Sequence, residues 1–198
     1  MKTISLKPNG ALFNGVETLA YYPTPKVGCT TVKTIVMHLL GDSRYPNKDT
    51  LWPHDVYRHP RFDKKIDIRF CLVRDPVQRF LSGYVNRVLF AKEIPHLPIE
   101  DFIDDFQNLK NRHWTVRHHF SPQVKNIGHN LEFYTHIFDI NEINSVFSLM
   151  SEFSGKEIKP FKTQTSNGMK KPNITSEYVN KIKEIYDIDY LTFGKYIK

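Results

Sequence analysis

Residues 17–41 read ETLAYYPTPKVGCTTVKTIVMHLLG, and the order of residue types in this stretch decides the fold. The apolar and aromatic run at 19–22 is typical of a short buried strand. A loop with proline and glycine follows over 23–29, and apolar residues then recur at helical spacing over 32–40. The stretch therefore predicts a strand, a loop and a helix, with Gly41 at the helix end.

The same order of elements is predicted a second time, beginning at residue 66. Residues 66–73 (IDIRFCLV) are strand-like, and Pro76 stands where the first residue of the next helix belongs. Two strand–loop–helix units with long connections predict an α/β domain with a parallel sheet. Ligands in such folds bind at the carboxyl ends of the strands, where both loops fall.

The remaining chain predicts further helices and one more strand. Apolar spacing predicts helices over 99–109 and 141–153, and a last helix through 179–186. Residues 131–140 alternate like a strand, whereas 112–128 is predicted to be a basic loop. The tail is expected to anchor on the core through its aromatic residues Tyr190, Phe193 and Tyr196.

Length and composition limit the class of protein. The chain has 198 residues, which predicts a single domain over 1–198, and 40% hydrophobic residues supply a core. A net charge of +7 suits polyanionic partners, which include phosphorylated cofactors, glycans and nucleic acids. No window holds the roughly 18 apolar residues that span a bilayer, so a cytoplasmic protein is expected. The spacing of Cys and His residues predicts no metal site.

The loop over residues 25–31 has the residue types of an anion site. Gly28 allows close approach of the backbone, and the start of the following helix favours negative charge. Thr30 and Thr31 add hydroxyl groups, and Lys26 adds a positive charge. The lysine precedes the glycine, so this is not the usual nucleotide-binding lysine loop. A capped helix with an incidental lysine is the structural alternative.

The second loop supplies an arginine and a serine. Arg74 ends the second predicted strand, and Ser82 lies eight residues later on roughly the same side of the helix. Both side chains can therefore bind one anion. The structural alternative is that Arg74 pairs with Asp75 or Asp67 and that Ser82 is an ordinary surface residue.

Taken together, the two loops resemble those of a known family. P-K-V-G-C-T-T-V-K (25–33) and V-R-D-P-V-Q-R-F-L-S-G-Y (73–84) are similar to the two PAPS-binding motifs of the carbohydrate sulfotransferases (sulfotransferase family 2-like), as in their bacterial members. PAPS is 3′-phosphoadenosine 5′-phosphosulfate. H-F-S-P-Q (119–123) and Y-D-I-D-Y-L-T-F-G-K-Y (186–196) resemble the acceptor-side segment and closing motif of that family. The resemblance implies a P-loop-like three-layer α/β domain, with a central parallel sheet flanked by helices.

The resemblance also implies a reaction and a set of site residues. The chain would transfer a sulfuryl group from PAPS to an acceptor hydroxyl, on a saccharide or a small hydroxylated metabolite. Arg74 and Ser82 would bind the 3′-phosphate, and Lys26 would also stabilise the leaving oxygen. The loop around the 5′-phosphosulfate would use Lys26, Gly28, Cys29, Thr30 and Thr31. A late basic loop would close over the nucleotide with Lys162, Thr163, Thr165, Lys170 and Lys171, of which Lys162 and Thr165 are the favoured candidates.

The acceptor hydroxyl needs a general base, and histidine suits this role at neutral pH. His118 and His119 match the histidines of the family's acceptor-side segment, and we favour His118 over its neighbour. The other candidate bases are Glu93, Glu100, Asp101 and His113.

Two other functions remain open on the sequence. The loop-to-helix anion site would also serve a P-loop-like nucleotide kinase or phosphotransferase. The positive charge would serve a non-catalytic nucleic-acid-binding module, although it is spread along the chain without a basic helix. The sulfotransferase interpretation itself predicts no nucleic-acid partner.

Overall fold

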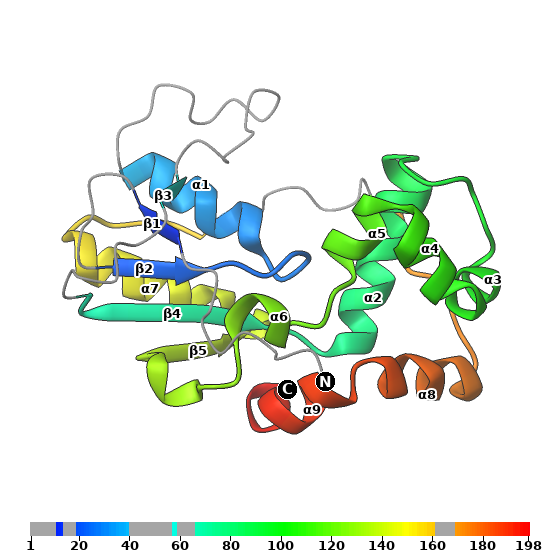
Figure 1. Cartoon of the computed structure of the whole chain (residues 1–198). Coiled ribbons are helices and arrows are strands. Elements are labelled where there is room, and N and C mark those ends of the chain that lie inside the picture. The colour runs from blue at the N-terminus through cyan, green and yellow to red at the C-terminus, as the bar shows by residue number, and fades with distance from the viewer. Residues whose placement is uncertain (1–10, 14–18, 40–56, 59–65, 161–168) are drawn as a thin grey trace.

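The structure is a computed structural model that describes residues 11–13, 19–39, 57–58, 66–160 and 169–198 (Figure 1). Its centre is a five-stranded sheet with the strand order β3-β1-β2-β4-β5. The strands are β1 (Ala11–Phe13), β2 (Leu19–Tyr22), β3 (Tyr57–Arg58), β4 (Ile68–Val73) and β5 (His136–Asp139).

Three neighbouring strands of the sheet are parallel. β2 pairs in parallel with β4, and β4 pairs in parallel with β5. β1 pairs antiparallel with β2 on one side and with β3 on the other. The register places Tyr22 opposite Cys71 and Val73 opposite Asp139, so the strands end near one another. The two strands predicted at 19–22 and 66–73 are thereby confirmed, the second beginning two residues later.

Both faces of β2 and β4 are buried, which explains why these strands are apolar without interruption. Leu19 and Tyr21 point to a face covered by α1 (Cys29–Leu39) and α7 (Ile143–Ser154). Ala20 and Tyr22 point to the opposite face. That face is covered by α6 (Val124–Ile127) and α9 (Asp187–Phe193). The predicted α/β domain with helices on both sides of a parallel sheet is confirmed.

A cluster of helices lies beside the sheet and has an aromatic core (Figure 1). Phe80 is at its centre, with its ring centroid 5.2 Å from that of Phe120 and 5.5 Å from that of Phe106. None of the helices in the described part of the chain is long and apolar enough to cross a membrane. The cluster comprises α2 (Pro76–Tyr84), η2 (Val85–Phe90), α3 (Ile99–Asp104), α4 (Phe106–Arg112), α5 (Trp114–His119) and α8 (Ser176–Ile185).

Three predicted elements differ from the structure. The single helix predicted over 99–109 is two helices, because the chain bends at Asp105. The basic loop predicted over 112–128 is wrong, since α5 and α6 form there and bury Val116 and Ile127. The strand predicted over 131–140 is shorter in the structure, where β5 covers only His136–Asp139 and a 3-10 turn precedes it. The short 3-10 turns are η3 (Leu131–Phe133), η4 (Ile140–Glu142) and η5 (Gly194–Tyr196).

Candidate active site

The two motif loops touch one another at the carboxyl ends of β2 and β4. The Arg74 guanidinium, which follows β4, donates from Nη1 to the backbone oxygen of Lys26 at 3.1 Å. The strand ends of a parallel sheet meet at one edge, which is where such folds bind ligands. Residues 48 positions apart therefore form one site.

The lysine loop has an unusual backbone. Lys26 and Gly28 both have positive φ angles, 66° and 70°, and they flank Val27, which is fully buried in the core. A positive φ is uncommon for a residue other than glycine and is often found at functional sites. At Gly28 a Cβ atom would also lie 2.7 Å from Cδ1 of Ile140. The loop thus needs glycine at this position for both its backbone angle and its space.

The loop leads directly into α1, as the sequence predicts. Cys29, Thr30 and Thr31 form the first turn and are half-buried, and this turn holds no acidic residue. The amide of Val32 donates to the Gly28 oxygen at 3.2 Å, which starts the helical hydrogen bonds. The first amides of a helix have no partner within it and favour an anion.

Positive charges gather around Lys26. Burial, together with the charges of Arg87 and Arg74, lowers the pKa of Lys26 to about 8. Arg87 comes from the π-helical segment η2 and forms an ion pair with Glu93. Glu93 also accepts a hydrogen bond from the Thr115 hydroxyl, which fixes the carboxylate in this pair. Lys26, Arg74 and Arg87 therefore act together on the loop, and the neighbouring carboxylates of Glu93, Asp75 and Asp139 offset part of their charge.

The two predicted histidines lie at the end of α5 and differ in environment. His119 is half-buried, and its Nδ1 atom is buried without a hydrogen-bond partner among the described residues. Burial lowers the pKa of His119 to about 3, with further contributions from Arg87, His118 and Lys26. His118 is exposed, and its ring stacks on Trp114 at a centroid distance of 4.8 Å. His119 is the histidine that shares the positive field of Lys26.

Arg79 joins the lysine loop to the histidine segment. Its side chain is 2% exposed, and Nη1 donates to the Pro25 oxygen at 3.3 Å and to the His119 oxygen at 3.2 Å. Nη2 donates to the Ser121 oxygen. The guanidinium carbon also lies 5.4 Å from the centre of the Tyr186 ring. One buried arginine therefore fixes the distance between the anion loop and the candidate base.

Ser82 lies on the open side of α2. The seven buried residues of α2 leave out Gln78 and Ser82, which are four positions apart and so share one helix face. The Lys171 ammonium reaches this face and donates to Oε1 of Gln78 at 2.6 Å. Burial lowers the pKa of Lys171, and the charge of Arg74 lowers it further. Lys171 and Arg74 thus lie near the start of α2, and Ser82 lies further along the same helix face.

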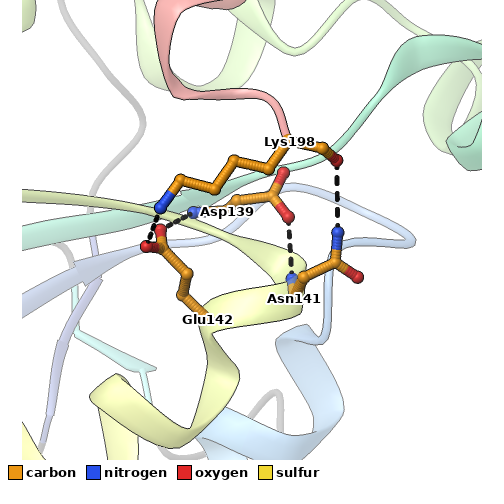
Figure 2. A network of polar contacts seen from close by, with 4 residues as sticks. All are labelled: Asp139, Asn141, Glu142 and Lys198. Carbon is orange, nitrogen blue, oxygen red and sulfur yellow. Dashed lines mark hydrogen bonds and ion pairs between the residues drawn. The ribbon is translucent and has the colours of Figure 1, made fainter.

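The end of β5 adds a buried carboxylate beside Arg74. Asp139 is fully buried, and its charge raises the pKa of Arg74 against the effect of burial. Oδ1 of Asp139 accepts from the amide of Asn141 at 2.8 Å, and its own amide donates to Glu142 at 3.0 Å. Figure 2 shows that Asn141 and Glu142 also hold Lys198 against this strand end.

Nine of the eleven site residues predicted from the sequence lie in the part of the chain that the structure describes, and two do not. Lys162 and Thr165 lie outside the described residues, although Lys171 of the same basic segment reaches Gln78. Arg79, Arg87 and Gln123 have no role predicted from the sequence, although Arg79 and Gln123 stand within the two motif segments 73–84 and 119–123. Within the described ranges, no group of three or more His, Cys, Asp or Glu residues is placed to hold a metal ion.

Comparison with known proteins agrees with the site. Searches among curated proteins and among solved structures gave no match. The family model described as the sulfotransferase family matches residues 9–196, which includes both motif loops and the closing motif. With that match over almost the whole length, the chain belongs to the sulfotransferase family and is a sulfotransferase enzyme.

Proposed function

We propose that the protein is a PAPS-dependent sulfotransferase that transfers the sulfuryl group to an acceptor hydroxyl. The observation that carries this proposal is the contact between Arg74 and Lys26, which joins the two loops into one positive site. Lys171 adds positive charge on the Arg74 side. PAPS carries anionic groups at its 5′ and 3′ positions, and the site offers cations at two neighbouring places.

The proposed position of PAPS follows from the cations at Lys26 and at Arg74. The 5′-phosphosulfate would lie against Lys26 and the first turn of α1, where Thr30 and Thr31 are half-buried. The 3′-phosphate would lie against Arg74, on the open face of α2 that carries Ser82. An arginine fork is well suited to phosphate because it donates two parallel hydrogen bonds.

The proposed reaction is an in-line displacement at sulfur. The acceptor oxygen forms a bond to sulfur while the bond from sulfur to the bridging phosphate oxygen breaks, and that oxygen keeps the electron pair. Lys26 stabilises this charge where it develops, which is the largest contribution that an enzyme commonly makes. The acceptor proton passes to a base on the protein, and the nucleotide product is adenosine 3′,5′-bisphosphate.

The structure favours His119 over His118 as the proposed base. A base must be neutral before it accepts a proton, and the pKa of about 3 keeps His119 neutral at pH 7. A pKa this low also makes His119 a weak base, so the proposed role requires its pKa to rise toward neutral pH when the donor binds. An anionic donor beside Lys26 would raise the pKa of His119, because it offsets the positive charges that lower it. His118 stacks outward on Trp114 and suits a place at the acceptor rim.

The acceptor would approach on the side of α5. Trp114 is 64% exposed, and its ring is nearly parallel to that of His118, with an angle of 6° between the planes. An exposed indole offers a flat surface for a sugar ring or another hydroxylated ring. We therefore propose a saccharide or a small hydroxylated metabolite as the acceptor.

The experiment that tests the donor is a thermal-shift titration with adenosine 3′,5′-bisphosphate, AMP and ATP, each without magnesium. A ligand present at 1,000 times its dissociation constant stabilises the folded state by about 4 kcal/mol. We expect stabilisation by the bisphosphate and little by the other two nucleotides. A shift with ATP or with nucleic acid, and none with the bisphosphate, would refute the proposal.

A matched pair of variants tests whether the response to the bisphosphate depends on Arg74. Arg74→Ala should remove the response to the bisphosphate, whereas Arg69→Ala should retain it. Arg69 lies on the same strand, but its guanidinium donates to the backbone oxygens of Ile66 and Phe133, away from the loops. Equal loss of response in both variants would show that the effect comes from the strand and not from the site.

Separate substitution of the two histidines tests the base. We expect His119→Ala to lower kcat by about 100-fold or more, because a positioned base contributes about 100- to 10,000-fold. His118→Ala should mainly raise KM for the acceptor. Steady-state assays with PAPS and varied acceptor concentration would measure both, and two fully active variants would exclude this segment as the source of the base.

A further inference from the structure

The backbone of Arg74 is held by a side chain and not by a strand. The parallel pairing of β4 with β5 ends at Val73 and Asp139, one residue before Arg74. Beyond that point, Oε1 of Gln123 accepts from the Arg74 amide at 3.0 Å and Nε2 donates to its carbonyl at 2.9 Å. Gln123 is fully buried. Its side-chain amide makes the two backbone hydrogen bonds with Arg74 that a neighbouring strand would otherwise make.

The backbone of Gln123 is in turn held by Asp189, a residue of α9. Oδ2 of Asp189 accepts from the Gln123 amide at 2.8 Å, and Oδ1 accepts from the Val124 amide at 3.0 Å. Asp189 is fully buried, and the charge of Arg79 opposes the rise in its pKa that burial causes. A carboxylate from the end of the chain thus fixes the segment that holds Arg74.

The residue next to Asp189 holds the other side of Arg74. The Tyr190 hydroxyl donates to Oδ2 of Asp75 at 2.7 Å, and Oδ1 of Asp75 accepts from the Gln78 amide at 2.8 Å. This second contact fixes the start of α2 immediately after Arg74. Consecutive residues of α9 therefore constrain Arg74 through Gln123 on one side and through Asp75 on the other.

We propose that Asp189, with Tyr190, is a positioning residue that sets Arg74 for the 3′-phosphate of the donor nucleotide. The inference rests on the proposed function, because it takes the ligand of Arg74 to be that phosphate. Asp189 does not touch the nucleotide; it acts through Gln123. An arginine fork binds phosphate only in a narrow geometry, so a shift of its backbone weakens binding even when its charge remains.

The measured quantity is the ratio of the affinities for adenosine 3′,5′-bisphosphate and AMP, obtained by isothermal titration calorimetry on the full chain. These ligands differ in the 3′-phosphate. A variant that loosens the whole domain weakens both ligands alike and leaves the ratio unchanged, whereas displacement of Arg74 lowers the ratio. Asp189→Asn is nearly isosteric but places an NH₂ group against one of the two backbone amides that the carboxylate now accepts.

We expect Asp189→Asn and Gln123→Ala to lower this ratio by about tenfold, the lower end of the loss that follows removal of a residue that orients a metal ligand. Tyr190→Phe should lower it by a smaller factor, because only one of the two constraints is lost. The matched control is Tyr178→Phe, which also removes a tyrosine hydroxyl bound to a carboxylate, that of Asp104 on α3, but none of the contacts that hold Arg74. The control should keep the wild-type ratio.

The outcomes separate this inference from the proposed function. A wild-type protein that prefers the bisphosphate, together with Asp189→Asn and Gln123→Ala variants that keep the full preference, would overturn the inference alone. A wild-type protein without that preference would refute the proposed function, and the inference with it. A ratio that falls equally in Tyr178→Phe would also overturn the inference, because the effect would then not depend on the contacts around Arg74.

Discussion

At the scale of single residues, the site depends on Lys26 being held in a conformation that a lysine rarely adopts. Its φ angle of 66° turns the chain between Pro25 and Val27, and the buried side chain of Val27 fixes this turn. The Lys26 carbonyl accepts from Arg74. Backbone strain of this kind persists only where the surrounding structure determines it. The lysine is therefore positioned before any ligand binds.

The lowered pKa of Lys26 predicts how ligand affinity depends on pH. With a pKa of about 8, the ammonium form dominates at pH 7 and the neutral amine dominates above pH 8. A phosphate ligand binds the ammonium form, and the phosphates are already ionised above their pKa of about 6. The affinity for adenosine 3′,5′-bisphosphate should therefore be constant up to about pH 8 and then fall by up to tenfold per pH unit.

Lys26→Arg tests whether deprotonation of Lys26 causes this decrease in affinity. Arginine keeps its proton throughout this range, so the decrease above pH 8 should disappear, even though the affinity itself falls because the fork is larger. Calorimetric titrations between pH 7 and pH 9.5 would measure both profiles. An identical decrease in the variant would assign the pH dependence to another group.

At the scale of elements, the sequence predicts the two strand–loop–helix units because each has a strong local signal. The strand β2 is apolar without interruption, and Pro76 and Asp75 mark the start of α2. The amide of Gln78 donates to Asp75 at 2.8 Å, as expected for the residue that caps a helix. These signals placed Lys26 and Arg74 at neighbouring strand ends.

The elements that the sequence misses are short ones that depend on distant contacts. The helices α5 and α6 have six and four residues, too few to show a helical period. The amides that begin α6 are bound by Asp189, a residue 65 positions away from Val124. The roles of Gln123 and Asp189 are also invisible in local sequence, because each holds a backbone group from another part of the chain.

The start of α1 gives a prediction that compares two glycines with the same backbone angle. Gly28 and Gly155 have φ angles of 70° and 65°, but only Gly28 has a neighbour, Ile140, in the place of a Cβ atom. Alanine at either position costs about 1–2 kcal/mol for the left-handed conformation. Gly28→Ala should therefore lower the free energy of unfolding more than Gly155→Ala does.

Chemical denaturation measures the free energy of unfolding of the two variants. Nucleotide titration then shows whether the substitution also changes the lysine loop. Affinity for adenosine 3′,5′-bisphosphate should fall in Gly28→Ala, since the loop must move away from Ile140, and stay unchanged in Gly155→Ala. Equal stability losses and equal affinities in the two variants would contradict the role given to the loop.

At the scale of the whole molecule, the sheet and the cluster of helices beside it are joined through Arg79. This arginine lies on α2 and donates to carbonyl oxygens of Pro25, His119 and Ser121, which belong to the lysine loop and to the end of the histidine segment. Asp189 of α9 supplies a buried negative charge that interacts with it. That residues 1–198 form one domain stays a prediction. The interaction between Arg79 and Asp189 is what would make the sheet and the helix cluster unfold together.

A double-mutant cycle on Arg79 and Asp189 tests that coupling. Arg79→Met removes the three backbone contacts and the nearby positive charge, and leaves the buried Asp189 carboxylate with only its two backbone amide donors, so the free energy of unfolding should fall by about 3–5 kcal/mol. Once Asp189→Asn has removed the buried charge, Arg79→Met should cost less. The interaction energy from urea denaturation should lie within about 0.5–3 kcal/mol.

The control cycle pairs Arg79→Met with Lys181→Met. Lys181 forms an exposed ion pair with Asp104 on the outer side of the helix cluster, so the two losses should add to within about 0.5 kcal/mol. Additive losses in the Arg79 and Asp189 cycle would show that the two charges stabilise their segments independently. A single unfolding transition in wild type, and two separate transitions in Arg79→Met, would instead identify this arginine as the link through which sheet and helix cluster unfold as one unit.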